Sequence, residues 1–266
     1  DYLDNNAQIS VNDWCTANGR FYDLRITEVQ TAAMSDMPDV NISQLMPLAN
    51  AAGADEPLVS VIMPAYNAEK YIANAVKSVL SQSHHTFELV VVDDGSTDRT
   101  RQIVASFADE RIKYICKENG GAPSARNRGI GVSKGSFLIM LDADDMMTPD
   151  FIAKHITEFE KHPEADLVYC DDLLIDENDQ PIRVIERPEY QDRKQLIRDL
   201  FRCGFPVVPF RTCIRKNVFD KIGYFDESLL VGEDYDMIRR FVKHGLQVHH
   251  LPAALYLRRI VSDSLS

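Results

Sequence analysis

The stretch Phe137-Leu138-Ile139-Met140-Leu141-Asp142-Ala143-Asp144-Asp145 decides the fold of this chain. Its first five residues are apolar, a run too short to cross a membrane and typical of a strand buried on both faces. Such strands belong to parallel sheets that helices cover. The three carboxylates that follow repel one another unless a cation or hydrogen bonds compensate their charge. The stretch therefore predicts a sheet strand that ends in a divalent-cation site, with a solvated acidic turn as the alternative.

Strand and helix patterns alternate along the chain from Pro57 onward. Apolar runs predict strands near residues 58–63, 87–92, 111–115, 137–141, 167–170 and 211–214. Helical spacing predicts helices after Asn67, near 103–107, across 122–132, after Thr148-Pro149-Asp150, across 195–201, and after Asn217 and Gly232. Asn67 is the expected N-cap of the first helix, and Pro149 is expected in the first turn of a later one. The alternation predicts an α/β fold with a mostly parallel, Rossmann-like sheet that is flanked by helices.

The chain divides into a short N-terminal extension or linker, residues 1–56, and one domain, residues 57–266. The extension shows no strong hydrophobic period. Because the chain starts at Asp1 rather than Met, we expect it to be a fragment of a longer protein. Residues 176–179 are expected to form the turn of a hairpin, since they lack the glycine and the distal glutamate of a calcium loop.

Composition and charge narrow the classes of function. The formal net charge of −12 argues against nucleic acid as a partner, because phosphate binding normally requires a basic surface. A nucleotide remains compatible with this charge if a metal ion bridges its phosphates. Neither a signal peptide nor an apolar run of membrane length is present, so we expect a cytoplasmic location. Widely spaced cysteines predict buried free thiols in a reducing compartment: Cys15, Cys116, Cys170, Cys203 and Cys213.

Polar segments follow three of the predicted strands: Pro64-Ala65-Tyr66-Asn67, Asp93-Asp94-Gly95-Ser96 and Asp142-Ala143-Asp144-Asp145. In open α/β sheets the carboxyl ends of neighbouring strands form a nucleotide crevice. With Ser124-Ala125-Arg126-Asn127 and Gly232-Glu233-Asp234, these segments make the chain similar to the family 2 glycosyltransferases, which have the GT-A fold. The resemblance extends from about Pro57 to the C-terminus. It implies an enzyme that transfers a sugar from a nucleotide-diphosphate sugar, most simply a UDP-sugar, to a hydroxyl of a carbohydrate or other acceptor.

The resemblance also implies which residues contact the nucleotide base. Pro64, Ala65 and Tyr66 would lie beside the nucleotide base, Asp94 would accept a hydrogen bond from it, and Asp93 would be a further donor-binding residue. Two alternatives stay open: Tyr66 as a core aromatic, and the Asp93-Asp94 segment as a turn that caps the next helix through Ser96 or Asp98.

The same resemblance assigns a metal ion and its ligands. Asp144 would coordinate Mg²⁺ or Mn²⁺ at the diphosphate, and Asp142 would hold the ribose or help to position the metal. Asp145 would orient these ligands. The ion would neutralise the charge that develops on the leaving nucleoside diphosphate.

Arg126 and the Glu233-Asp234 pair complete the implied site. Arg126 would lie near the donor, with a surface salt bridge as the alternative. Asp234 would be the catalytic base that deprotonates the acceptor, and Glu233 would take that role or hold the acceptor. This implies single displacement with inversion. The alternative for the pair is an acidic helix N-terminus favoured by the helix dipole.

The C-terminal segment departs from the family pattern. Arg258 or Arg259 would close over the diphosphate, although Ile260 and Val261 stand where a histidine is expected, and His249 and His250 are expected to be structural. Residues 204–211 and the C-terminal tail would border the acceptor site. An inactive nucleotide-sugar-binding or scaffold domain is one alternative, and a sugar-phosphate nucleotidyltransferase is another. By analogy of fold we expect polysaccharide or glycoconjugate synthesis, with any attachment to the inner membrane face through parts outside this chain.

Overall fold

The computed structural model describes residues 56–190, 192–203, 211–229 and 231–261, with only the backbone described for residues 200–203. The predicted N-terminal extension therefore lies outside the described residues, apart from Glu56. So does most of the segment predicted to border the acceptor site, and so does the end of the C-terminal tail. No helix within the described ranges combines the length and the apolar character needed to cross a bilayer.

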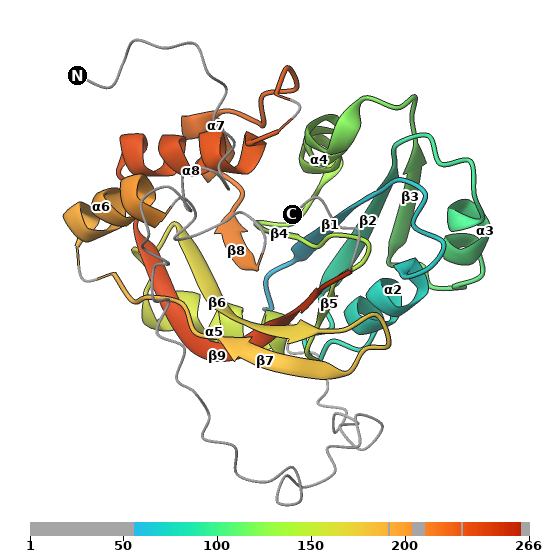
Figure 1. The fold of residues 1–266 in the computed structure, drawn as a ribbon, viewed down its shortest axis with the longest axis horizontal. Coiled ribbons are helices and arrows are strands. Elements are labelled where there is room, and N and C mark those ends of the chain that lie inside the picture. Colours follow the sequence, from blue (N-terminus) through green and yellow to red (C-terminus); the bar gives the residue numbers. More distant parts are fainter. Residues whose placement is uncertain (1–55, 191, 204–210, 230, 262–266) are drawn as a thin grey trace, which may run out of the picture. The chain divides into compact units, whose positions relative to one another are not determined.

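One sheet organises the described residues (Figure 1). Strands β1 (Val59–Ala65), β2 (Phe87–Asp93), β3 (Ile112–Cys116) and β4 (Phe137–Met140) are parallel and lie in the order β3-β2-β1-β4. The sheet continues through β8 (Thr212–Arg215), β6 (Leu167–Ile175), β9 (Val248–Arg259) and β5 (Met146–Met147), while β7 (Pro181–Ile185) pairs with β6. Strand β8 is antiparallel to both β4 and β6, so β6 and its parallel neighbour β9 run in the direction of β4. The predicted mostly parallel α/β sheet is confirmed.

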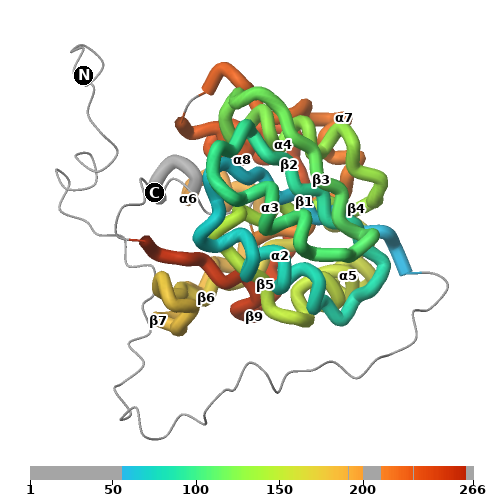
Figure 2. Tube along the Cα trace, turned by 90° about the vertical axis from the view of Figure 1, so that its right-hand side faces the viewer, coloured from blue at the N-terminus to red at the C-terminus, as the bar shows by residue number. Residues whose placement is uncertain are grey.

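Helices cover both faces of this sheet, as Figure 2 shows with α4 and α8 above the strands and α2 and α5 below them. One core layer holds α2 (Ile72–Leu80), α3 (Thr100–Ala105) and α5 (Phe151–Lys161) against the sheet. The other face carries α4 (Gly121–Val132), α6 (Arg193–Cys203), α7 (Val218–Ile222) and α8 (Glu233–His244). Strands β1 and β4 are fully buried between the two layers, as their apolar sequences predict.

Several local predictions were wrong. Helix α2 begins at Ile72 after Tyr71, so Asn67 is no N-cap and instead adopts a positive φ of 48°. Helix α5 begins at Phe151, which leaves Pro149 in the loop before it. Among the cysteines whose side chains are described, Cys170 and Cys213 are buried free thiols as expected, but Cys116 is exposed. The hairpin predicted around residues 176–179 is confirmed by the pairing of β7 with β6.

Gly129 lets α4 lie close against the sheet. A Cβ atom at this position would stand 2.3 Å from Cγ2 of Ile62, a fully buried residue of β1. Gly131, one half-turn further along α4, has no atom within 4 Å of its corresponding position. The two glycines therefore offer a matched pair, because both have helical backbone and only one touches the core.

We expect Gly129→Ala to lower the free energy of unfolding by about 1–3 kcal/mol, since the added methyl group overpacks a rigid core. Gly131→Ala should raise it by about 0.5–1 kcal/mol through the gain in helix propensity. Urea unfolding of both variants would measure the difference. Equal effects of the two substitutions would contradict the close packing of α4 on β1.

His155 is a fully buried histidine of α5 that stacks on Phe151 with ring centroids 4.1 Å apart. Its Nδ1 lies 2.7 Å from the carbonyl oxygen of Phe151, so this nitrogen carries the proton of the neutral ring. Burial lowers the pKa of His155 to about 4. The folded protein thus resists protonation of a ring that the unfolded chain protonates near its ordinary pKa of about 6.5.

Because the folded pKa lies below the unfolded one, His155 costs stability as the pH falls from about 6.5 towards 4. The cost approaches about 3 kcal/mol near pH 4. The free energy of unfolding of the wild type should therefore fall between pH 7.5 and pH 4.5. In His155→Phe this fall should be smaller by about 2–3 kcal/mol, because the variant has no buried imidazole to protonate. Urea unfolding at both pH values tests this, with the exposed His85→Gln as the control that should follow the wild type.

Candidate active site

The carboxyl ends of β2, β1 and β4 lie side by side, as predicted, because these strands are neighbours in the parallel part of the sheet. Pro64 and Ala65 are buried within β1 at this edge. The side chain of Tyr66 follows them and is 54% exposed, so the alternative of a core aromatic is wrong. An exposed aromatic ring at this edge is free to contact a planar ligand.

Asp93 and Asp94 are both buried, and each has a different set of partners. Asp93 ends β2, accepts a hydrogen bond from the hydroxyl of Tyr114, and closes a turn by accepting from the amide of Ser96 at 2.7 Å. This turn fits the structural alternative. The Asp98 carboxylate accepts from the amide of Thr100, the first residue of α3, at 2.9 Å, although Arg99 stands at the N-cap position itself.

Asp94 contacts the start of α4. Its carboxylate accepts from Nζ of Lys117 at 2.5 Å and from the amides of Gly120 and Gly121 at 3.1 and 2.7 Å. Gly121 has a φ of 86°, which a residue with a side chain rarely adopts. Asp94 thus joins the end of β2 to the positively polarised N-terminus of a helix, where a negative charge is favoured.

The acidic turn after β4 contains carboxylates in two environments. Both oxygens of Asp145 are engaged inside the protein, by the hydroxyl of Tyr256 at 2.7 Å and by the amide of Arg259 at 2.8 Å. Burial and the charges of Asp144 and Asp142 raise the pKa of Asp145 to about 8. Asp145 therefore anchors the turn and has no oxygen directed to a ligand.

Asp142 and Asp144 are the carboxylates of this turn that remain for ligands. The Asp142 side chain is 32% exposed. Burial, and then the negative charge of Asp142, raise the pKa of Asp144 above its ordinary value. A divalent cation would relieve this repulsion, and two carboxylates plus phosphate oxygens are a donor set that suits Mg²⁺ or Mn²⁺. The residues fit the predicted metal ion on the chemistry of their donors.

Arg126 of α4 joins two of the predicted segments. Its Nη2 donates to Asp142 at 3.0 Å and its Nη1 donates to Glu233 at 2.9 Å. The Arg126 side chain is only 6% exposed, so the alternative of a surface salt bridge is wrong. The guanidinium therefore holds the end of β4 and the first residue of α8 in one cluster, although these residues are far apart in the chain.

Glu233 and Asp234 differ in their partners. Glu233 is paired with Arg126, whereas the Asp234 carboxylate accepts from the amide of Tyr235 at 2.7 Å. Burial, with a smaller contribution from the charge of Glu233, raises the pKa of Asp234. Of the two carboxylates, Asp234 is thus the one better suited to accept a proton.

Three residues outside the predicted acidic and aromatic segments support the strand ends, and Lys117 among them was not predicted from the sequence. Lys117 follows β3 as Asp94 follows β2, so the same argument from strand ends could have identified it. Arg259 was expected to close over a diphosphate, but its side chain is buried and donates to the Asp144 carbonyl oxygen at 2.8 Å and to Asp179 at 2.5 Å. The predicted structural role of His250 fits its 2.8 Å contact with Asp171.

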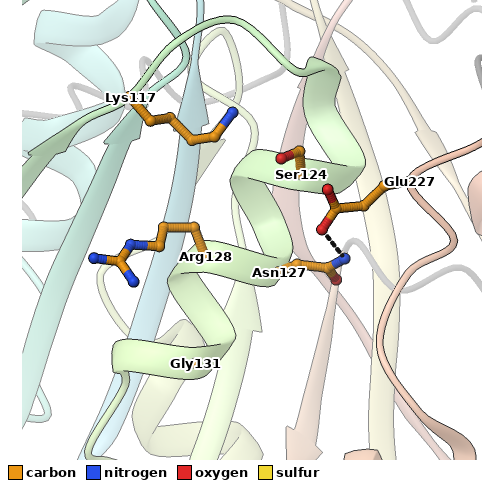
Figure 3. Close-up of a pocket in the computed structure, with 6 residues that line it drawn as sticks. All are labelled: Lys117, Ser124, Asn127, Arg128, Gly131 and Glu227. Atoms are coloured by element: carbon orange, nitrogen blue, oxygen red, sulfur yellow. Dashed lines mark hydrogen bonds between the residues drawn. The ribbon is translucent and has the colours of Figure 1, made fainter.

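Asn127, next to Arg126 on α4, holds the loop that leads to α8. Its side chain donates to the carbonyl oxygen of Phe225 at 2.9 Å and to Glu227 at 2.8 Å, and it accepts from the amide of Phe225. Figure 3 shows the hydrogen bond between Asn127 and Glu227, two residues that line an open pocket of about 320 Å³ along α4. The pocket is lined by Lys117, Ser124, Asn127, Arg128, Gly131 and Glu227.

A parallel sheet with acidic side chains at the carboxyl ends of its strands is an arrangement typical of nucleotide-binding α/β proteins. The chain belongs to the family described as "Glycosyl transferase family 2", whose model matches residues 60–223. Uncharacterised glycosyltransferases of Rickettsia typhi and Rickettsia prowazekii are each 36% identical to it over 189 residues. Those matches cover 70% of this chain and 59% of each relative, so the chain spans less than two thirds of their length.

Solved structures support the same family and the GT-A fold. Staphylococcus aureus TarS, residues 1–349, superposes with a TM-score of 0.64 and 26% sequence identity, over 76% of this chain and 60% of that one. The same protein has been solved in complex with UDP, at a TM-score of 0.62, and with UDP-GlcNAc, at 0.63.

The ion-pair cluster around Arg126 yields a quantitative prediction. Arg126→Met should lower the free energy of unfolding by about 3–5 kcal/mol, because it leaves Asp142 and Glu233 uncompensated in a partly buried site. Glu233→Gln should then be less destabilising in the Arg126→Met background than in the wild type, since it removes one of the two repelling charges. Urea unfolding of the four proteins gives the coupling energy. Additive effects would contradict the bridging role of Arg126.

Proposed function

We propose that this chain is an inverting, metal-dependent glycosyltransferase that moves a sugar from a UDP-sugar to an acceptor hydroxyl. The observation that carries the proposal is the cluster in which Arg126 contacts both Asp142 and Glu233. This cluster brings Asp142, a carboxylate suited to a metal-bound diphosphate, close to the start of α8, which carries Asp234. Membership of glycosyltransferase family 2 and the UDP and UDP-GlcNAc complexes of TarS support the choice of donor.

In the proposed donor site, the base lies at the edge formed by β1 and β2. Tyr66 contacts the base through its exposed ring, while buried Pro64 and Ala65 shape the strand beneath it. Asp94 accepts from the base imide, which requires it to exchange some of its contacts with Lys117 and α4. Asp93 acts indirectly by closing the turn that sets the position of Asp94.

Asp142 and Asp144 would hold Mg²⁺ or Mn²⁺, which would supply charge neutralisation for the departing diphosphate. Asp145, Tyr256 and Arg259 keep the turn that carries these two ligands in place. Arg126 orients Asp142 and compensates part of the negative charge that remains.

Asp234 acts as the general base. It takes the proton of the acceptor hydroxyl as that oxygen bonds to the anomeric carbon, and the bond from this carbon to the diphosphate breaks on the opposite side. This single displacement inverts the anomeric configuration and needs no covalent enzyme intermediate. The raised pKa of Asp234 favours proton transfer, because a base acts best when its pKa approaches the working pH. Glu233 holds the helix start through Arg126.

The acceptor is proposed only as a class. It is a hydroxyl of a carbohydrate or another molecule, in polysaccharide or glycoconjugate synthesis, on the cytoplasmic side of a membrane. A nucleotidyltransferase would need a glycine-rich loop after the first strand. Here the loop after β1 lacks glycine, and its Asn67 is tied to Ser96 at 2.9 Å.

The test is release of UDP from a panel of UDP-sugars with Mn²⁺, with and without EDTA and acceptor sugars, combined with calorimetric UDP binding. We expect EDTA and Asp144→Asn to abolish release and to weaken UDP binding together. Asp234→Asn should lower the rate at least about a hundredfold while UDP binds as in the wild type. Glu110→Gln, an exposed carboxylate before β3 at the other end of the sheet, is the control.

Two outcomes would contradict parts of the proposal. UDP binding that requires Mn²⁺ but leads to no turnover with any donor or acceptor would favour the inactive nucleotide-sugar-binding domain. Absence of UDP binding would reject the donor site itself. Wild-type rates in Asp234→Asn would reject this residue as the base.

A further inference from the structure

A second cluster of ligating side chains lies outside the proposed active site. Glu158 and His162 are one turn apart at the end of α5, and His249 is the second residue of β9. One atom from each of these side chains lies within 4.8 Å of the others. The start of β9 lies at the end of the sheet opposite the acidic turn, since β9 runs in the direction of β4. This cluster is therefore separate from Asp142 and Asp144.

From this geometry we propose that Glu158, His162 and His249 form a binding site for a divalent transition-metal ion of the Zn²⁺ class. Two imidazoles and a carboxylate are a ligand set that Zn²⁺ uses with water in the remaining position. The proposal does not depend on the proposed function, which concerns oxygen ligands and Mg²⁺ or Mn²⁺ at the other end of the sheet.

The distances fit one small ion. Oε2 of Glu158 lies 3.1 Å from Nε2 of His249 and 4.0 Å from Nε2 of His162. Two ligands bound tetrahedrally to Zn²⁺ at their usual lengths are about 3.4 Å apart. The His249 contact is about 0.3 Å shorter and the His162 contact about 0.6 Å longer than this spacing, so the site needs an adjustment that is larger at His162.

Neighbouring side chains complete the site. Oε1 of Glu158 is neutralised by Nζ of Lys161 at 2.8 Å, which leaves Oε2 facing the two histidines. Nδ1 of His162 lies 3.4 Å from the carboxylate of Glu164. A carboxylate at this nitrogen favours the tautomer in which Nε2 is the free ligand atom, as second-shell carboxylates do in zinc sites.

Binding requires one rearrangement. The rings of His162 and His249 are stacked, with centroids 3.7 Å apart and planes at 27°, so their lone pairs do not yet converge on one point. His162 is the residue that would rotate, because it lies at the C-cap of α5 and its side chain is 37% exposed. Rotation about its side-chain bonds leaves α5 and β9 in place.

The experiment uses the full chain, stripped of metal and held in excess Mg²⁺ so that the acidic turn does not take up the probe. Zn²⁺ binding is measured by calorimetry, and Co²⁺ serves as an optical probe of tetrahedral nitrogen and oxygen coordination. We expect one Zn²⁺ per chain, with an affinity that falls at least tenfold in His249→Asn, His162→Asn and Glu158→Gln. His85→Asn, an exposed histidine of the loop before β2, should bind Zn²⁺ within twofold of the wild type.

His162→Asn keeps the test decisive if the other variants fold poorly, since it leaves the contact between His249 and Glu158 intact. Asp144→Asn should keep its Zn²⁺ affinity and lose Mn²⁺-dependent UDP binding, which separates this proposal from the proposed function. Two results would overturn the site: no Zn²⁺ binding, or equal affinity in His162→Asn and the wild type. The second result would mean that the three side chains form only a hydrogen-bonded contact between α5 and β9.

Discussion

The buried guanidinium of Arg126 is the interaction on which the rest of the site depends. A buried cation is stable only when anions face it, and here Asp142 and Glu233 do so from segments that are far apart in the chain. Its location follows from the packing of α4, because Gly129 allows the helix to approach Ile62 of β1. The packing of Gly129 against Ile62 thus determines the position of the Arg126 guanidinium. The guanidinium in turn holds the start of α8 beside the end of β4.

The carboxylates of the site differ in their surroundings, and these differences indicate which of them are structural and which can take part in chemistry. Asp145 is enclosed by hydrogen bonds, Asp142 is paired with Arg126, and Asp144 is half-buried with a raised pKa. At the start of α8, Glu233 is paired with Arg126, whereas Asp234 is half-buried and its carboxylate accepts from the amide of Tyr235. When neighbouring carboxyl groups are driven apart in pKa by their surroundings, one can serve structure and another chemistry. Sequence spacing alone does not distinguish them.

The sequence predicted what depends on local pattern. Alternating apolar runs identified the strands, and the order of the polar segments placed Asp94 and Asp142 at neighbouring strand ends. It failed where tertiary contacts override local preference: Asn67 was expected to cap α2, but its amide and side chain bond to the loop after β2. Arg259 appeared to be a candidate for the diphosphate because its charge was visible and its burial was not. The bridge from Arg126 to Glu233 was equally invisible, since no pattern pairs residues 107 positions apart.

The two halves of the sheet contribute differently to the site. The parallel strands β3-β2-β1-β4 present the polar segments. Strand β9 is the last of the described strands in the sequence, and it holds the acidic turn through Tyr256 and Arg259, 111 and 114 residues from Asp145. Contacts at such separation cost loop-closure entropy, and the pairing of β6 with β9 along most of its length helps to offset this cost. A metal ion joining the start of β9 to α5 would act on this same strand. The position of the acidic turn is therefore a property of the whole sheet, including the strand furthest from it in sequence.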